Sequence, residues 1–450
     1  MEQQELNIKV SKIKAILESE GMNVKTVFVE EGPAVTLFKL EFQDRANLNC
    51  IMELRDSFGV SLSTIGVRVL QLHDSLIGIE VPNWHREKVS FSGIFDRTKD
   101  ALMEYTLPLV LGKTFSDVPV NLDLAKAPHL LCAGATKQGK SILVKTLIAS
   151  LLLTKQPDEM QILLFDPRLI NLTEFKDVAK IFNYPEQSEW ALRAILAEME
   201  RRFKILAENK VSTLSQYNNI SAERLPHIVI VIDELADYTL PYGNELFGRS
   251  FRDHLISIAQ LGLSVGVHVI AVTQRPSRDV INAYINAIFS TRVAFRTISE
   301  NDSFTIIDCP DAAKLTGLGD MLLSNEGELT RVQGCYISED ELDLIVKDAY
   351  SRGVRQTSLP PFETSETASE IISPASLDER FEEVARFVVD KQKASVAAIQ
   401  RTFGLGYARA MRIMDQLEYF SIVGPLNDEV IRPLLIKNLK DLDDLLDKLK

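Results

Sequence analysis

The chain is poor in cysteine, and the four cysteines among its 450 residues are widely separated: Cys50, Cys132, Cys309 and Cys335. None of them forms a C-x-x-C pair, and none lies near a histidine at the spacing of a zinc site. This pattern argues against a disulfide-stabilised secreted domain and against a structural zinc site. It favours free thiols in a reducing compartment, which predicts a cytoplasmic location.

Long apolar runs are also lacking. The N-terminal sequence MEQQELNIKVSKIK has no apolar region of the kind found in signal peptides. The longest apolar run, residues 142–153, is interrupted by Lys145 and is too short to span a bilayer. We therefore expect no membrane segment in this chain. The sequence leaves open a membrane anchor on a longer parent protein.

Positively charged residues are outnumbered: the chain has 50 Lys and Arg and 63 Asp and Glu, which gives a formal net charge of −13. An acidic balance is only a weak argument against nucleic-acid binding, since binding depends on where the cations gather. The hydrophobic content of 46% and charged content of 25% are ordinary for globular proteins, so we expect a sizeable core. The length predicts about three domains at roughly 100–200 residues each.

Changes in sequence texture divide the chain into five segments. Residues 1–105 predict a small α+β domain, and residues 106–355 alternate short apolar runs with helical stretches. That alternation predicts an α/β fold, with a parallel sheet covered by helices on both faces. Residues 356–375 are rich in Ser, Thr, Pro and Glu and predict a linker. Residues 376–437 predict three helices and a small hairpin, the pattern of a winged helix, and residues 438–450 form a charged tail.

Within the first segment we expect one helix over residues 5–19 and a second near 46–58. The expected strands cover residues 24–29, 35–42, 67–71 and 76–81.

A glycine-rich loop between an apolar strand and a helical run predicts a phosphate site. It matches the pattern G-x-x-x-x-G-K-[ST] and consists of Gly134, Ala135, Thr136, Lys137, Gln138, Gly139, Lys140 and Ser141. Backbone N–H groups of such a loop point at phosphates, the lysine reaches the β- and γ-phosphates, and the hydroxyl ligates Mg²⁺. The loop therefore predicts binding of ATP with Mg²⁺ at a helix N-terminus.

Two further polar groups follow apolar strands downstream. Asp233 and Glu234 end the run HIVIVI, where the first carboxylate can hold the Mg²⁺ shell and the second can polarise the attacking water. Gln274 ends the next strand, and its amide either contacts the γ-phosphate or the water, or serves as a helix cap or core amide.

The predicted winged helix carries a local excess of positive charge. Between residues 391 and 412 there are five cations and no Asp or Glu: Lys391, Lys393, Arg401, Arg409 and Arg412. On a helix-turn-helix pattern such a run is expected to face DNA phosphates, with residues 407–420 as the recognition helix.

At this point several segments resemble one family. HLLCAGATKQGKS, IVIVIDELADY, VIAVTQRPSRDVI, STRVAF and GLGDMLL are similar in order and spacing to the FtsK/SpoIIIE motor. EGPAVTLFKLEF and GIEVPN resemble the small domain before that motor, and SVAAIQRTFGLGYARAMRIMDQLE resembles its C-terminal winged helix. The resemblance covers about residues 12–433.

The resemblance implies a RecA-like motor in a homohexameric ring that hydrolyses ATP at subunit interfaces and moves double-stranded DNA through its pore. Lys140, Ser141, Asp233, Glu234 and Gln274 would form the nucleotide site. It also implies a role of the chromosome-segregation type, with recombinase or cell-division proteins as partners.

The chain departs from the family pattern at several positions. The family usually has Ser- or Gly-type residues at Lys137 and Gln138, and an arginine where Leu263 stands. Further positions with changed residues are Asn286, Ile288 and Phe304. Because that arginine is a candidate to reach the neighbour's ATP, we expect Arg292 or Arg275 as the remaining trans-acting groups.

By family match, the base-reading positions of the recognition helix are Ala408, Arg412 and Asp415. Arginine can grip guanine with two hydrogen bonds, whereas alanine cannot hydrogen-bond a base edge. We therefore expect an altered or relaxed sequence preference.

Three functional hypotheses follow. The first is an ATPase that translocates duplex DNA. The second is the same motor with another cargo, in protein secretion or conjugative transfer, against which the basic winged helix argues. The third is a diverged paralogue that binds nucleotide and DNA with weak or no hydrolysis, which the missing arginine favours.

Overall fold

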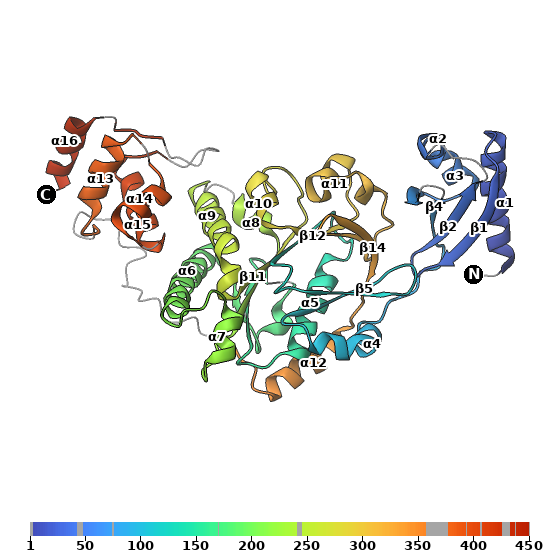
Figure 1. Ribbon diagram of the computed structural model, residues 1–450, viewed down its shortest axis with the longest axis horizontal. Helices are drawn as coiled ribbons and strands as arrows, with labels where there is room; N and C mark the ends of the chain where they lie inside the picture. Colours follow the sequence, from blue (N-terminus) through green and yellow to red (C-terminus); the bar gives the residue numbers. More distant parts are fainter. Residues whose placement is uncertain are drawn as a thin grey trace.

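A computed structural model describes residues 3–42, 48–73, 76–169, 171–240, 245–356, 377–392, 394–405, 407–424, 433–436 and 438–449 (Figure 1). The P-loop motor fold, the N-terminal α+β domain and the C-terminal winged-helix domain expected from the sequence are all present. The predicted linker, residues 356–375, falls almost wholly outside the described residues.

The N-terminal domain is a four-stranded antiparallel sheet in the order β1-β2-β4-β3, with helix α1 packed on one face (Figure 1). Its elements are α1 (Gln3–Ser19), β1 (Val24–Glu31), β2 (Val35–Phe42), α2 (Leu48–Glu53), α3 (Arg55–Ser61), β3 (Arg68–His73) and β4 (Leu76–Pro82). Ile13 and Leu17 of α1 are fully buried with Phe38 and Ile79 of the sheet. The second helix expected from the sequence is two short helices on either side of Leu54.

The motor contains a ten-stranded sheet in the order β6-β5-β14-β13-β12-β7-β11-β10-β8-β9. The strands are β5 (Pro108–Lys113), β6 (Pro119–Asp123), β7 (His129–Ala133), β8 (Met160–Phe165), β9 (Lys180–Phe182), β10 (His227–Ile232), β11 (Val267–Thr273), β12 (Thr291–Phe295), β13 (Asp320–Asn325) and β14 (Glu328–Gly334). The six strands from β12 to β9 are parallel, as the sequence predicts. The other four extend the sheet as antiparallel strands, which the alternation of strands and helices did not indicate.

Helices cover both faces of this sheet. They are α4 (Phe91–Met103), α5 (Lys140–Thr154), α6 (Pro185–Glu208), α7 (Leu214–Ile220), α8 (Leu235–Thr239), α9 (Glu245–Leu261), α10 (Ala283–Ile288), α11 (Glu300–Ile307) and α12 (Glu339–Ser351). Alternate residues of the central strands enter opposite cores, one with α4, α5 and α12, and the other with α6, α9, α10 and α11. A parallel strand buried on both faces must be apolar throughout, which explains the continuous run VHVIAVT of β11.

Helix α4 belongs structurally to the motor. Phe91, Ile94 and Leu102 are buried in the same core as α5. We therefore propose that the domain boundary lies before α4, near residue 90, rather than at residue 105.

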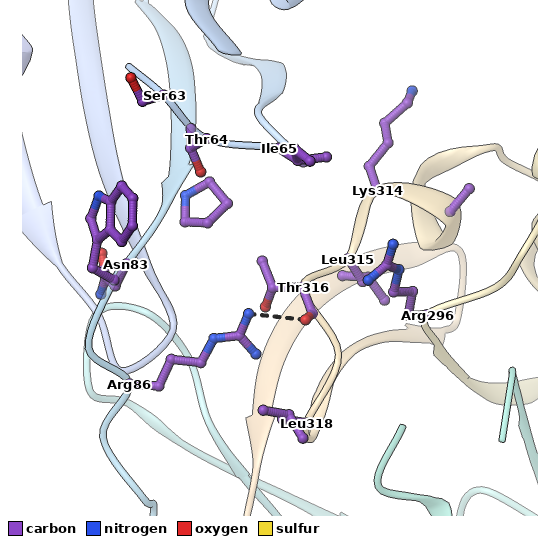
Figure 2. A pocket seen from close by; sticks show the side chains of 14 residues that line it. Ser63, Thr64, Ile65, Asn83, Arg86, Arg296, Lys314, Leu315, Thr316 and Leu318 are labelled. Carbon is purple, nitrogen blue, oxygen red and sulfur yellow. Dashed lines mark hydrogen bonds between the residues drawn. The ribbon is translucent and has the colours of Figure 1, made fainter. Parts of the chain in front are cut away.

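A groove of about 730 Å³ lies between the N-terminal domain and the motor (Figure 2). Arg86 reaches across it and donates to the carbonyl oxygens of Thr316 at 2.9 Å and Gly317 at 3.0 Å. The same loop contacts the glycine-rich loop, because Gly319 N donates to the carbonyl oxygen of Gln138 at 2.8 Å. One motor loop, residues 316–319, thus links the N-terminal domain to the phosphate-site sequence.

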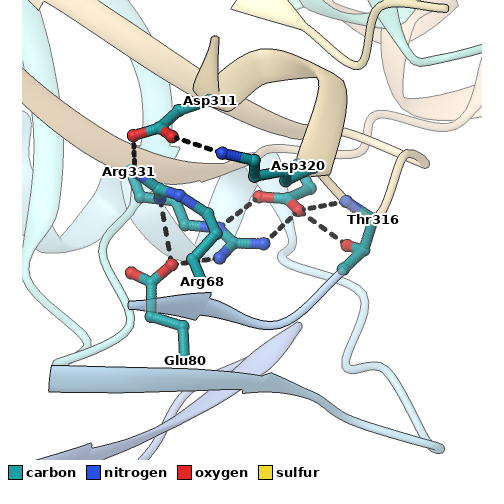
Figure 3. Close-up of polar contacts among 7 residues, drawn as sticks. Arg68, Glu80, Asp311, Thr316, Asp320 and Arg331 are labelled. Carbon is teal, nitrogen blue, oxygen red and sulfur yellow. Dashed lines mark hydrogen bonds and ion pairs between the residues drawn. The ribbon is translucent and has the colours of Figure 1, made fainter. Parts of the chain in front are cut away.

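A buried ionic network fixes this junction (Figure 3). Arg331 of β14 donates to Asp320 at 2.9 and 2.6 Å and pairs with Glu80 of the N-terminal domain. The guanidinium of Arg68 donates one hydrogen bond to Glu80 at 3.0 Å and another to Asp311 of the motor at 2.8 Å. Burying charges is unfavourable unless each one is paired, so this network requires the two domains to remain together.

The C-terminal domain consists of α13 (Phe381–Asp390), α14 (Val396–Phe403), α15 (Tyr407–Tyr419) and α16 (Leu439–Leu449). Val423 and Leu434 form an antiparallel bridge where the sequence predicts the wing hairpin, whose residues 425–432 lie outside the described part of the chain. The charged tail forms α16, with Leu442 and Leu446 buried in this domain's core. No helix in the described ranges is long and apolar enough to cross a membrane.

Three histidines lie at the starts of central strands, and burial keeps them neutral. His129 accepts from Val269 N at 3.1 Å and donates to the Ala259 carbonyl oxygen at 2.7 Å, which requires the neutral ring. The Nδ1 atom of His227 and the Nε2 atom of His268 share a hydrogen bond of 3.1 Å. Burial lowers the pKa of His129 and of His227 from 6.5 to about 4, and it lowers the pKa of His268 well below 6.5.

The first prediction concerns the junction. Arg331→Leu should destabilise the protein by about 3–5 kcal/mol, because it leaves Glu80 and Asp320 buried without their partner. Urea denaturation followed by circular dichroism measures this. Arg97→Ala removes an exposed ion pair with Asp117 and serves as the control, with an expected change below about 1 kcal/mol. Equal effects of the two changes would refute the structural role of Arg331.

The second prediction concerns acid stability. In the unfolded chain the buried histidines take up protons near pH 6.5, whereas in the folded protein they do so only near pH 4. Stability should therefore be fully present above pH 6.5 and fall as the pH drops towards 4, by up to about 1.4 kcal/mol per pH unit and histidine. His129→Gln should flatten this slope, while His85→Gln at an exposed histidine should not. Unfolding curves between pH 4 and 8 test this, and an unchanged slope in His129→Gln would contradict it.

Candidate nucleotide site

The glycine-rich loop connects β7 to α5, as expected. A Cβ at Gly134 would lie 2.8 Å from the Cβ of Phe295, and one at Gly139 would lie 2.9 Å from the backbone nitrogen of Gly319. Both glycines also have positive φ values, 149° and 118°. The close approach of neighbouring backbone therefore requires glycine at both positions.

Lys140 is folded into the loop. Its Nζ donates to the carbonyl oxygens of Gly134 at 2.7 Å and Ala135 at 2.6 Å, and only 4% of the residue is exposed. Burial lowers its pKa to about 8, opposed by the charges of Glu234 and Asp233. A phosphate group would supply this buried ammonium with the close anionic partner that stabilises its charged form.

Lys137 has a φ of 62°, in the left-handed region that a side chain with a Cβ rarely adopts. This is one of the two loop positions where the family usually has Ser- or Gly-type residues. The departure noted in the sequence therefore places a lysine in a conformation that glycine would adopt freely.

Asp233 and Glu234 follow β10 directly. The register pairs Ile232 with Phe165 of β8 and with Ala271 of β11, so the residues after these strands meet at one edge of the sheet. Asn171 Nδ2 donates to Asp233 Oδ2 at 2.8 Å. Burial raises the pKa of Asp233, the Asn171 hydrogen bond lowers it, and the charge of Asp166 raises it again.

These oxygen groups fit a magnesium ion. Mg²⁺ takes few protein ligands, usually one or two carboxylates or hydroxyls, and leaves the rest to phosphate and water. Asp233 is a largely buried carboxylate beside a second negative charge, which a cation would relieve, and Ser141 lies in the first turn of α5, directly after Lys140. Among the described residues no group of three or more His, Cys, Asp or Glu offers an alternative metal site.

Glu234 is held in an unusual geometry. Its φ of 67° and ψ of 78° place it in the left-handed region, at the turn from β10 into α8. Its carboxylate accepts from Thr273 Oγ1 at 2.7 Å and from Gln274 N at 3.0 Å. The Oε1 atom of Gln274 in turn accepts from Thr136 Oγ1 at 2.7 Å. Glu234, Gln274 and the phosphate loop therefore form one hydrogen-bonded unit.

The sequence prediction missed three residues of this edge, namely Asp166, Arg168 and Asp237. Asp166 follows β8 and accepts from the backbone nitrogens of Arg168, Asn171 and Leu172. Arg168 forms two hydrogen bonds with Asp237 of α8, at 2.8 and 3.0 Å. The sequence signal that could have indicated Asp166 is the same as for Asp233, namely an acidic residue directly after an apolar strand.

Arg292, expected from the sequence as a group that acts on a neighbour's ATP, has its guanidinium engaged within its own fold. All three guanidinium nitrogens are used within the fold: Nε donates to Phe289 O, Nη1 to Ile306 O and Asp308, and Nη2 to Asn286 O. These bonds hold the guanidinium between α10, α11 and β12. Leu263 lies on the 3-10 helix η2 (Gly262–Val265), and 47% of it is exposed.

Among the predicted DNA-contacting residues, Lys391 and Arg401 are exposed, and Lys391 pairs with Asp390 at 3.0 Å. Arg409 forms a bidentate ion pair with the buried Asp378, at 3.0 and 2.9 Å, which joins α15 to the chain before α13. Lys393 and the side chains of Ala408, Arg412 and Asp415 lie outside the described part.

Comparisons with known families cover most of the chain. Residues 94–278 match the FtsK/SpoIIIE family, residues 1–83 match the FtsK alpha domain, and residues 375–437 match the FtsK gamma domain. Among solved structures, the pCW3 conjugation coupling protein TcpA, a monomer form with ATPγS, superimposes with a TM-score of 0.56. That match has 20% identity and covers 75% of this chain and 99% of TcpA, so it supports the fold alone.

Curated relatives are more similar. The DNA translocase FtsK of Clostridium tetani is 34% identical over 449 residues, a match that covers 97% of this chain and 60% of the relative. The DNA translocase FtsK of Haemophilus influenzae is 35% identical, with 90% of this chain and 83% of the relative covered. The DNA translocase SpoIIIE of Bacillus subtilis is 32% identical, with 95% and 56% covered. The chain thus spans about three fifths of the length of several relatives, and it belongs to the FtsK/SpoIIIE family.

Proposed function

We propose that the chain is the motor of a DNA translocase that couples ATP hydrolysis to movement along double-stranded DNA. The observation that carries the proposal is the hydrogen-bonded unit of Thr136, Glu234 and Gln274 beside Lys140 and Asp233. It stands in a chain that also has the FtsK gamma domain and is about one third identical to DNA translocases.

Each residue of the site has a distinct role in this proposal. The loop amides and Lys140 bind the β- and γ-phosphates of ATP. Ser141 and Asp233 would hold Mg²⁺, which neutralises phosphate charge when bound. Glu234 orients and polarises the attacking water, and Gln274 contacts the γ-phosphate.

The DNA-binding role rests on two parts of the chain. The ring through which duplex DNA passes would be a homohexamer of this motor, located in the cytoplasm. In the winged helix, Lys391, Lys393 and Arg401 would contact phosphates and Arg412 a base edge. The ion pair with Asp378 gives Arg409 a different part, which is to orient the recognition helix α15.

The third prediction concerns hydrolysis. Wild-type turnover should rise when duplex DNA is added, Lys140→Ala should bind ATP poorly, and Glu234→Gln should bind ATP without hydrolysing it. Phosphate release and binding of a fluorescent ATP analogue, each with and without duplex, separate these effects. Lys155→Ala, a lysine that donates to the Tyr105 carbonyl oxygen away from the loop, is the control. Full turnover in Glu234→Gln would remove the role assigned to Glu234.

A specific observation favours a second candidate, a diverged paralogue with weak hydrolysis. The usual family arginine is replaced by Leu263, and Arg292 is committed to bonds within its own fold. Such a paralogue would bind both ATP and DNA but hydrolyse ATP only slowly.

The fourth prediction separates the two candidates. If the lost arginine limits hydrolysis, Leu263→Arg should raise the turnover number, since one such arginine contributes roughly 10³-fold or more in other phosphoryl-transfer enzymes. Leu261→Arg is the matched control, because Leu261 is similarly exposed, 45% against 47%, and lies two residues away. A rapid wild-type enzyme that Leu263→Arg does not accelerate would contradict the paralogue.

A further inference from the structure

The carboxylate of Glu234 is held by several close hydrogen bonds. Both of its carboxylate oxygens accept hydrogen bonds at the end of β11. Oε1 accepts from Thr273 Oγ1 at 2.7 Å, and Gln274 N donates to Oε2 at 3.0 Å and to Oε1 at 3.2 Å. Glu234 is 6% exposed and Thr273 is fully buried. These two donors come from the last residue of β11 and the residue that follows it.

We propose that Thr273 is a positioning residue for hydrolysis, whose hydroxyl fixes the direction of the Glu234 carboxylate. The inference rests on the proposed role of Glu234 in polarising water. A carboxylate can activate water only when one lone pair points at it, so the rotation of the carboxylate must be restricted. The left-handed backbone of Glu234 fixes the direction of its Cα–Cβ bond, and the hydrogen bond from Thr273 fixes the orientation of its carboxylate.

The orientation of the Thr273 hydroxyl is itself determined by its surroundings. Its oxygen accepts from the backbone nitrogen of Arg275 at 3.1 Å. Its proton has two acceptors, Glu234 Oε1 at 2.7 Å and the Arg275 carbonyl oxygen at 3.4 Å, and the charged, nearer carboxylate is the stronger of the two. A methyl group in place of the hydroxyl would preserve the packing of β11. It would also leave one oxygen of a buried carboxylate without this donor.

The same contact connects Glu234 to the phosphate loop. Gln274 donates to Glu234 through its backbone and accepts from Thr136 through its side chain. Phosphate oxygens can only accept hydrogen bonds, so a γ-phosphate near Thr136 would compete with Gln274 for the threonine proton. Gln274 could then turn its amide NH₂ group to the phosphate, while Thr273 and the Gln274 backbone continue to hold Glu234.

The test compares three substitutions in the full chain with duplex DNA present. Thr273→Val should lower kcat by about tenfold to a hundredfold, a part of what a positioned base contributes, while KM for ATP changes less than about twofold. Thr273→Ser retains the hydroxyl and should restore most of the turnover. Thr239→Val is the matched control, because Thr239 is also buried and donates to the Leu235 carbonyl oxygen in α8, so its loss should leave kcat unchanged.

The outcomes distinguish this inference from the function on which it rests. If Glu234→Gln is inactive but Thr273→Val keeps wild-type kcat, the positioning role is refuted and the proposed function stands. If Glu234→Gln is fully active, the role of Glu234 itself fails. A Thr273→Val protein in which KM rises several-fold as kcat falls, or that Thr273→Ser does not rescue, would show a structural role only. Should Thr273→Val fail to fold, Thr273→Ala gives the same comparison.

Discussion

The site depends on the register of four parallel strands, β8, β10, β11 and β7. Phe165 pairs with Ile232, Ile232 with Ala271, and Thr273 with Ala133, so all four strands end close to one line across the sheet. The next residues along the chain are Asp166, Asp233, Gln274 and Gly134, which are the groups that the chemistry requires. Because hydrophobic burial on both faces fixes this register, the core of the motor also sets the geometry of the site.

The second constraint is the junction with the N-terminal domain. Arg331 bridges Glu80 and Asp320, and Arg86 donates to the loop that contacts the phosphate-site sequence at Gln138. Movement of the N-terminal domain therefore cannot leave this loop unaffected.

Much of this arrangement could be predicted from the sequence because its signals are local. The glycine-rich loop, the carboxylates after HIVIVI and the three helices of the winged domain all follow from short patterns of residues. The packing of helix α4 could not be predicted, since only the tertiary structure shows that Phe91 and Ile94 join the motor core. The partners of Arg292 could not be predicted for a related reason, because Asn286, Ile306 and Asp308 gather around it only in the fold. Thr273 is ordinary as a strand residue, and its contact with Glu234 spans 39 positions.

The central claim is that ATP hydrolysis at this site moves the protein along duplex DNA. Displacement of a labelled third strand from a triplex, placed at a distance from a duplex entry site, measures that movement directly. The account predicts displacement with ATP, with a delay that increases with the distance to the triplex, and no displacement with a non-hydrolysable analogue. DNA-stimulated hydrolysis without any displacement, at every distance tested, would contradict it.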